Sequence, residues 1–306
     1  SMLREYLFSE SMFYLNIPTT RSLAVMKTGE KIYRNEINDG AILTRIASSH
    51  IRVGTFEYIS TFCNKDELKL FTHYVIKRHY PELLSSSTPE IMLLKSVIKK
   101  QINLIVEWLR VGFIHGVMNT DNMSIIGETI DYGPCAFMNV YNPQTVFSSI
   151  DTQGRYAFGN QSRIGHWNLS VFASTLLPLI AEDIDYAKSI CQEIINEYPK
   201  LFLIDYYNMM FNKLGIIYPE KSDKKIVDDL ISIMTINKLD YTDTFAILTL
   251  NNKPYENYFK SQDMINWCNN WQNRIKQLGN YQNSIKLMEK NNPKKILRNY
   301  LVESVI

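Results

Sequence analysis

The 306-residue chain has little net charge and no long apolar run, and each absence removes a class of function. Lysine and arginine (33) nearly balance aspartate and glutamate (31), so the composition does not support a broad basic surface for nucleic acid. No run approaches the roughly 18 apolar residues of a membrane-spanning helix, and the N-terminal residues lack a basic start followed by an apolar stretch. We therefore expect a soluble protein with neither nucleic acid nor a membrane among its partners.

Cysteines are few, and they lie far apart in the sequence. This spacing argues against a zinc knuckle and against a disulfide framework, so we expect a reducing compartment. With 45% hydrophobic residues the chain can bury one large core or two unequal ones, which indicates a globular protein of one to two domains. The cysteines are Cys63, Cys135, Cys191 and Cys268.

The first 54 residues predict a helix followed by part of an antiparallel sheet. Leu3, Leu7 and Tyr14 recur at helical spacing, and Pro18 closes that segment. Strand-forming residues then gather in three short runs, which turn-forming residues separate. The predicted strands are 22–27, 32–35 and 41–46, and the predicted separators are 28–30 and 38–40.

From residue 55 onward the pattern becomes helical. Helices are predicted at 55–64, 65–78 and 89–110, and the pattern is helical again from Trp167 to the end. The third of these helices carries a continuous apolar stripe, which should form the core of the larger part of the molecule. The architecture is therefore a small mixed part, a large helical part and an irregular loop at their junction. The stripe consists of Ile91, Leu94, Ile98, Ile102, Ile105 and Leu109.

The loop 113–134 carries the most informative polar residues, set between apolar runs that favour strands. Asn122 and Asp131 lie nine residues apart across a short turn at Gly127, so a hairpin could bring both side-chain oxygens to one ion. Asp121 supplies a further oxygen, as a base or as a partner of a metal ligand. This pattern suits Mg-ATP chemistry. The residues alone also allow an Asx-rich turn in which Asp131 caps a loop.

The order of these residues resembles the catalytic loop of kinases. His115-Gly116, Asn122 seven residues after the histidine, and the tripeptide 131–133 (Asp-Tyr-Gly) look like the kinase catalytic loop and the metal-binding Asp-Phe-Gly. One departure is Val117, which stands where those kinases place their catalytic aspartate. Ordinary transfer of the γ-phosphoryl group is therefore disfavoured. His115 is expected to order the loop through backbone hydrogen bonds.

Longer motifs resemble the selenoprotein O family, known in bacteria as the YdiU family, and the resemblance extends over essentially the whole chain. The segments that carry it are 4–10, 17–21, 45–57, 115–124, 129–134, 151–161, 167–169, 292–294 and 297–301.

The resemblance implies an α+β, protein-kinase-like two-lobed fold with a truncated small lobe (1–54) and a mainly α-helical large lobe (55–306). It also implies a protein adenylyltransferase, which binds ATP in reverse and moves AMP to Ser, Thr or Tyr hydroxyls of proteins. By this resemblance Asp121 is the proton acceptor, Asn122 and Asp131 bind Mg (or Mn), Arg45, Arg52 and Asp131 hold the nucleotide, and Glu5 pairs with an ATP-binding lysine. The compartment would be cytoplasmic in a bacterium and mitochondrial in a eukaryote.

Several alternatives remain at the level of sequence. Family members carry a Gly-rich segment and the ATP-binding lysine before the first helix, and they continue beyond Ile306, so a piece of a longer protein is expected. A non-catalytic, pseudokinase-like nucleotide-binding module is one alternative, and a phosphotransferase with Asp121 as its base is another. Arg52 could instead pair with Glu57, and a lone glutamate such as Glu5 on an amphipathic helix usually faces solvent.

Overall fold

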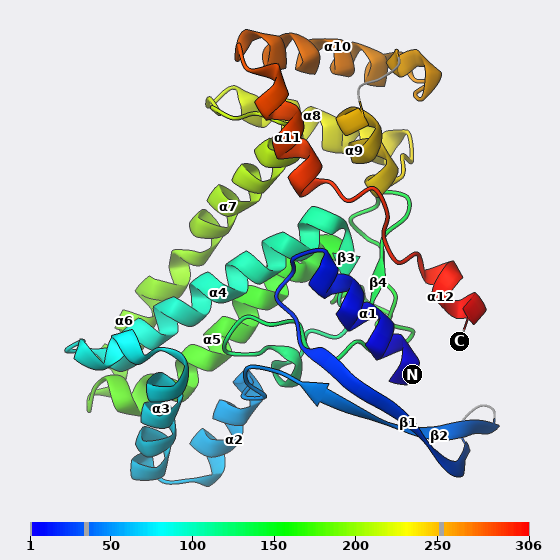
Figure 1. Ribbon diagram of the computed structural model, residues 1–306. Coiled ribbons are helices and arrows are strands. Elements are labelled where there is room, and N and C mark those ends of the chain that lie inside the picture. The colour runs from blue at the N-terminus through cyan, green and yellow to red at the C-terminus, as the bar shows by residue number, and fades with distance from the viewer. Residues whose placement is uncertain (1, 34–36, 251–253, 306) are drawn as a thin grey trace.

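The computed structural model describes residues 2–33, 37–250 and 254–305, and these form an α+β structure in which helices predominate (Figure 1). Helix α1 (Met2–Tyr14) precedes the antiparallel pair β1 (Arg21–Tyr33) and β2 (Ile37–Ile46), which projects from the helical body. The remaining strands are β3 (Phe113–Ile114) and β4 (Ala136–Phe137). The remaining α-helices are α2 (Val53–Phe62), α3 (Lys65–His79), α4 (Pro89–Val111), α5 (Gln161–Ile180), α6 (Ile184–Asn196), α7 (Tyr198–Lys213), α8 (Asp223–Ile236), α9 (Tyr241–Leu250), α10 (Gln262–Gln277), α11 (Tyr281–Asn291) and α12 (Asn299–Val305), and the short 3-10 helices are η1 (Pro81–Ser85), η2 (Thr120–Asn122), η3 (Phe158–Asn160) and η4 (Tyr255–Asn257).

Helix α4 is the centre of the helical body, as its apolar stripe predicts. It packs against α5 and α7, and its residues Leu94, Ile98, Ile102 and Leu109 are buried. The helix ends at Gly112, whose φ of 73° is a left-handed conformation that favours glycine. The predicted helices at 55–64, 65–78 and 89–110 are confirmed, with ends that differ by one or two residues.

The prediction of three short strands is wrong, because the chain forms two long ones. Residues 28–30 do not separate two strands; they form an irregularity inside β1, where the register shifts between Lys27 and Lys31. Residues 38–40 lie inside β2, where Asp39 pairs with both of these lysines. Hydrogen bonds from Lys31 and then Lys27 lower the pKa of Asp39 to about 2. Two residues of the predicted strand 32–35, at positions 34 and 35, lie outside the described residues.

The predicted hairpin within 113–134 is also wrong. β3 pairs with β4, so its strand partner comes after the polar loop and not from within it. The segment between β3 and β4 instead crosses the molecule as an irregular chain, which contacts the N-terminal part at several points. These contacts with the N-terminal part determine where the polar residues lie, and the hydrogen bonds of a β-hairpin do not.

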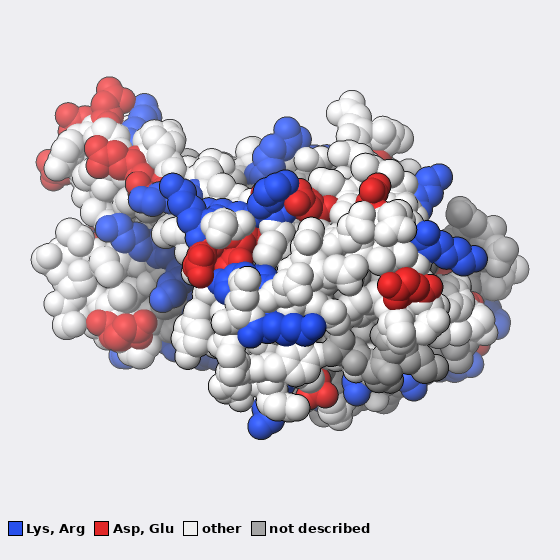
Figure 2. Space-filling view, turned by 90° about the horizontal axis from the view of Figure 1, so that it is seen from above, with Lys and Arg blue, Asp and Glu red and all other residues white. Residues whose placement is uncertain are grey.

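The positions of the chain ends and the distribution of charge on one face can be seen in Figures 1 and 2. Both ends of the chain lie on the same side of the molecule (Figure 1). On the face shown in Figure 2, basic and acidic side chains lie beside one another, so this face has no continuous field of one sign. Across the described ranges, no helix combines the length and the apolar character needed to cross a membrane.

Candidate active site

The polar loop is fastened to the N-terminal part of the chain by two isolated β-bridges. Arg52 bridges Ser124 in antiparallel fashion, with the Val53 amide donating to the Met123 carbonyl at 2.9 Å. Thr19 bridges Thr129 in parallel fashion, with the Thr129 amide donating to the Pro18 carbonyl at 2.9 Å. The first bridge places Arg52 next to η2, and the second places the residues before Asp131 next to the segment that follows α1.

Buried polar side chains reinforce both bridges, and the sequence patterns did not identify them. Thr129 Oγ1 accepts a hydrogen bond from Trp108 Nε1 at 2.8 Å and donates to the Pro18 carbonyl at 2.9 Å. The amide of Gln101, a fully buried residue of α4, donates to the Ser124 carbonyl. A buried polar residue on an otherwise apolar helix stripe was the available signal, because such a group persists only with a partner.

His115 orders the loop through hydrogen bonds to its backbone, as expected. Its ring is buried, and its Nε2 lies 2.9 Å from the Ile130 carbonyl, directly before Asp131. Burial lowers the pKa of His115, so the neutral ring donates from Nε2 to that carbonyl. The backbone amide of His115 donates to Gln161 Oε1 at 3.0 Å. Asn168 similarly donates to the Met118 carbonyl at 2.9 Å, so α5 supports the loop through two amide side chains.

Asn122 and Asp131 lie side by side, although no hairpin joins them. Asn122 Nδ2 donates to Asp131 Oδ2 at 3.2 Å and to the Val117 carbonyl at 2.9 Å. These two bonds use the amide nitrogen and leave Asn122 Oδ1 free to face a ligand. Asp131 has a φ of 70°, a left-handed conformation that is uncommon outside glycine. Such conformations gather at functional sites, where neighbouring structure holds them in place.

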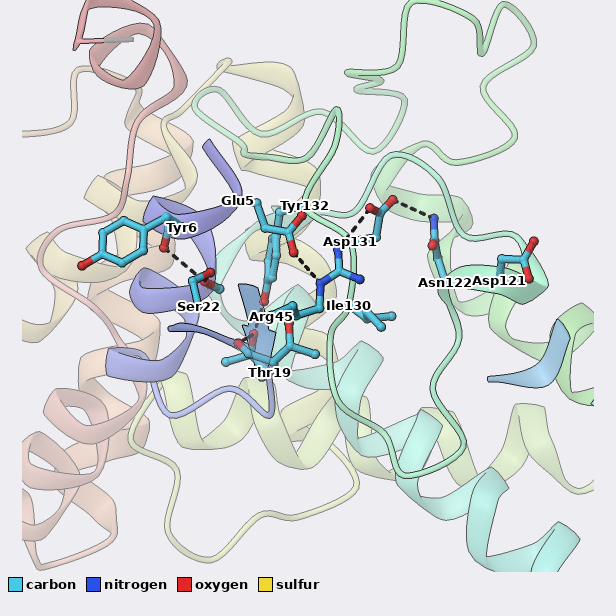
Figure 3. Close-up of polar contacts among 12 residues, drawn as sticks. Glu5, Tyr6, Thr19, Ser22, Arg45, Asp121, Asn122, Ile130, Asp131 and Tyr132 are labelled. Atoms are coloured by element: carbon cyan, nitrogen blue, oxygen red, sulfur yellow. Dashed lines mark hydrogen bonds and ion pairs between the residues drawn. The ribbon is translucent and has the colours of Figure 1, made fainter. Parts of the chain in front are cut away.

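Arg45 joins Glu5 to Asp131, as Figure 3 shows. Its Nε donates to Glu5 Oε1 at 2.6 Å, and its Nη2 lies 3.4 Å from Asp131 Oδ1. Burial alone lowers the pKa of Arg45, but the hydrogen bond and the charge of Glu5 outweigh it, so the pKa is raised. Glu5 is 7% exposed, so the expectation that such a glutamate faces solvent is wrong: its charge is compensated by Arg45 and therefore tolerates burial.

Arg52 lies beside Asp121 on the other side of the cluster. Its Nη1 donates to the backbone carbonyl of Asp121 at 3.1 Å, and its Nε is buried without a hydrogen-bond partner. The alternative ion pair between Arg52 and Glu57 does not occur in the described part of the chain. The Asp121 side chain is exposed and lies against Gly54, the second residue of α2. In Figure 3 it lies beyond Asn122, on the side away from Asp131.

The oxygen atoms of Asn122 and Asp131 suit a hard cation that a phosphate-bearing substrate also binds. Within residues 2–33, 37–250 and 254–305, no group of three or more His, Cys, Asp or Glu residues is placed to hold a metal by itself. Asn122 Oδ1 and the Asp131 carboxylate provide two oxygens, and Mg²⁺ usually takes its other ligands from phosphates and water. The two residues therefore fit Mg²⁺ only together with a phosphate-bearing ligand. A groove between α4, α6 and α7 shares no residue with this site.

Comparison with known proteins shows which family the chain belongs to. The family model described as protein adenylyltransferase SelO matches residues 1–306. The chain belongs to the SelO family. Relatives named protein nucleotidyltransferase YdiU cover all of this chain: that of Clostridium botulinum is 52% identical, and those of Nitrosococcus oceani and Anoxybacillus flavithermus are each 50% identical. The chain spans 62% of the length of the first two relatives and 63% of the third. The resemblance inferred from the motifs is thus confirmed.

Proposed function

We propose that this chain contains the catalytic centre of a protein adenylyltransferase, which transfers AMP from Mg-ATP to hydroxyl side chains of proteins. The observation that carries the proposal is the convergence of Arg45 and Arg52 on the loop that holds Asp121, Asn122 and Asp131, in a chain of the SelO family. The proposal includes a protein-kinase-like arrangement, with residues 1–54 as the remnant of the small lobe and 55–306 as the large lobe.

The two arginines support binding of a nucleotide in the reversed direction. Guanidinium groups bind phosphate oxygens through paired hydrogen bonds, and they do so best where solvent is partly excluded. The buried, unpartnered Nε of Arg52 is a donor in need of such an acceptor. Arg45 holds Asp131 through a single 3.4 Å contact, so its guanidinium can also bind a phosphate. If both arginines hold the outer phosphates, the α-phosphate faces Asp121.

Each polar residue of the loop then has a role. Asn122 and Asp131 would hold Mg²⁺ (or Mn²⁺), which when bound supplies positive charge beside the phosphates. Asp121 accepts the proton of the attacking hydroxyl, the hydroxyl oxygen forms a bond to the α-phosphorus, and pyrophosphate leaves. The exposure of Asp121 suits this role, because a protein side chain must reach it. Glu5 holds Arg45 in this structure, and by the family pattern it would also pair with an ATP-binding lysine.

Val117 favours a second candidate function. It occupies the position of the kinase catalytic aspartate, which is the pattern expected of a pseudokinase-like module that binds nucleotide without turnover. Transfer of the γ-phosphoryl group with Asp121 as base ranks third.

Labelled ATP separates the three functions. The complete protein is incubated with ATP labelled at either the α- or the γ-phosphate, together with candidate protein substrates, and the modified proteins are analysed by mass spectrometry. We expect only the α-label to reach protein, as AMP. Transfer of the γ-label would indicate a phosphotransferase, and nucleotide binding without transfer of either label would indicate the non-catalytic module.

A further inference from the structure

The guanidinium group of Arg4 on α1 binds four acceptors from two distant parts of the chain. Its Nε donates to the Gly133 carbonyl at 3.1 Å, and its Nη2 donates to the Cys135 carbonyl. The other two acceptors belong to α12: Asn299 Oδ1 lies 2.7 Å from Nη2, and Glu303 Oε1 lies 2.6 Å from Nη1. The side chain is 13% exposed and also lies over the ring of Phe8 at 4.7 Å. Four of its five N–H donors are therefore used.

The two carbonyls that Arg4 binds belong to residues two and four positions after Asp131, whose backbone conformation is uncommon outside glycine. A non-glycine residue with a φ of 70° is strained, and it persists only when its surroundings determine its conformation fully. Before Asp131, the chain is held by the Thr19–Thr129 bridge and by His115 at the Ile130 carbonyl. After Asp131, Arg4 holds the carbonyls of residues 133 and 135.

We propose that Arg4 is a positioning residue for the metal-binding aspartate, and that α12 acts on the same loop through Arg4. This inference rests on the proposed function. Asn299 and Glu303 fix the guanidinium from the C-terminal side, because a planar fork that is already bound to two side chains has few orientations left for its other donors. The α12 contacts thereby fix the positions of residues 133 and 135. Through these positions they determine the orientation of the Asp131 carboxylate in the site.

Two readouts test this inference in the complete protein. Arg4→Gln should accelerate amide hydrogen exchange about tenfold in peptides covering residues 131–137, and it should weaken Mn²⁺ binding in the presence of ATP about tenfold, the lower end of the range for residues that orient metal ligands. Asn299→Ala combined with Glu303→Gln should shift both readouts in the same direction by a smaller factor. Arg4→Lys should recover only part of the loss, because an ammonium group cannot match the planar fork.

The matched control is Arg78→Gln, which removes an exposed arginine of α3 and should change neither readout. Exchange of residues 131–137 in Arg4→Gln equal to that of the wild type would overturn the inference, as would faster exchange with unchanged Mn²⁺ affinity. A uniform increase in exchange over the whole chain would assign Arg4 a general structural role and also overturn it. If the wild type neither binds Mn²⁺ nor transfers AMP, the proposed function fails, and local exchange still decides whether Arg4 holds the loop.

Discussion

Asp131 combines a charged side chain with a backbone conformation that most residue types avoid. At a φ of 70°, aspartate, asparagine and glycine are tolerated far better than residues with larger or branched side chains. Substitution at this position therefore changes the backbone as well as the ligand. A useful comparison must keep the backbone and remove only the charge.

Asp131→Ala should abolish metal-dependent binding of ATP, because it removes one of two protein oxygens and disfavours the local backbone. Asp131→Asn is the matched variant, since asparagine accepts the left-handed conformation and retains one oxygen. We expect it to bind Mg-ATP with intermediate affinity. Isothermal titration calorimetry with and without Mg²⁺ measures both, and unchanged affinity in Asp131→Ala would remove this residue from the site.

Replacing Arg45 or Arg52 by alanine should have the same effect on AMP transfer and different effects on the free energy of unfolding. Either alanine substitution should reduce AMP transfer by about two orders of magnitude, the loss typical of one preorganised donor. Arg45→Ala should also lower the free energy of unfolding by about 1–3 kcal/mol, because it leaves Glu5 buried without a partner. Arg52→Ala should cost less stability, since it loses only the exposed hydrogen bond from Nη1 to the Asp121 carbonyl and leaves no buried charge without a partner.

The double variant Arg45→Ala with Glu5→Gln separates these two effects. It should recover part of the stability and none of the AMP transfer. Urea denaturation and transfer assays on the same preparations provide the measurement. Full AMP transfer by a variant lacking both arginines would contradict the reversed binding of ATP.

Helix α2 contributes to the site through the absence of a side chain. A Cβ atom on Gly54 would collide with Asp121 Oδ1, so glycine lets the carboxylate lie against the start of the helix. Gly54→Ala should therefore displace Asp121 and reduce kcat for AMP transfer by up to about a hundredfold, since a shift of about 1 Å in a reacting group can cost that much.

The binding of Mg-ATP should be unchanged in Gly54→Ala, because the three atoms nearest to a Cβ on Gly54 all belong to Asp121 and not to Asn122 or Asp131. Thr61→Ala, at an exposed position of the same helix, controls for helix propensity and should leave kcat unchanged. Normal kcat in Gly54→Ala would mean that Asp121 does not need its present position.

The predictions that succeeded rest on periodicity within one element. The stripe on α4 extends over about five turns and determines both a helix and its buried face, so Ile98 and Ile102 could be placed in the core from sequence alone. The strand boundaries failed because Gly29 and Gly40 indicate turns equally well when they lie inside a strand with a bulge. Local patterns do not distinguish the two cases.

The candidate site was predictable as a set of residues and not as a set of contacts. Motif resemblance pointed to Arg45, Asp131 and Glu5 separately, but their contact through one guanidinium depends on how α1 packs against β2. Arg4 stands in the matching segment 4–10, but no sequence pattern assigns it partners or a role. Its partners at positions 133, 135, 299 and 303 become neighbours only after the whole chain folds.

Lys213 connects three helices of the body and makes stability depend on pH. Its buried Nζ donates to the Arg110 carbonyl of α4 at 2.7 Å and lies 3.9 Å from the centre of the Phe245 ring of α9. Burial, and then the charge of Arg110, lowers the pKa of Lys213 well below its usual value. An unfolded lysine keeps its proton up to about pH 10.4. Between the folded and unfolded pKa values the unfolded chain binds more protons, so stability rises with pH.

Lys213→Met should remove this contribution. The free energy of unfolding of the wild type should therefore increase relative to that of Lys213→Met as the pH rises from about 7 to 9.5, with a slope of at most about 1.4 kcal/mol per pH unit. Urea denaturation across this range measures the difference. Lys69→Met, at an exposed position of α3, is the control. A constant difference between wild type and Lys213→Met would show that Lys213 titrates alike in both states.

The fastening of the polar loop to the N-terminal part also bears on the order of folding. The bonds that assemble the site join residues far apart in the sequence: 69 positions separate Arg52 from Asp121, 86 separate Arg45 from Asp131, and 111 separate Pro18 from Thr129. Closing such long loops costs entropy before any contact repays it, whereas helices form from local contacts. During refolding, helical circular dichroism should therefore recover before the ability to bind nucleotide, because the site is complete only when both halves of the chain have met.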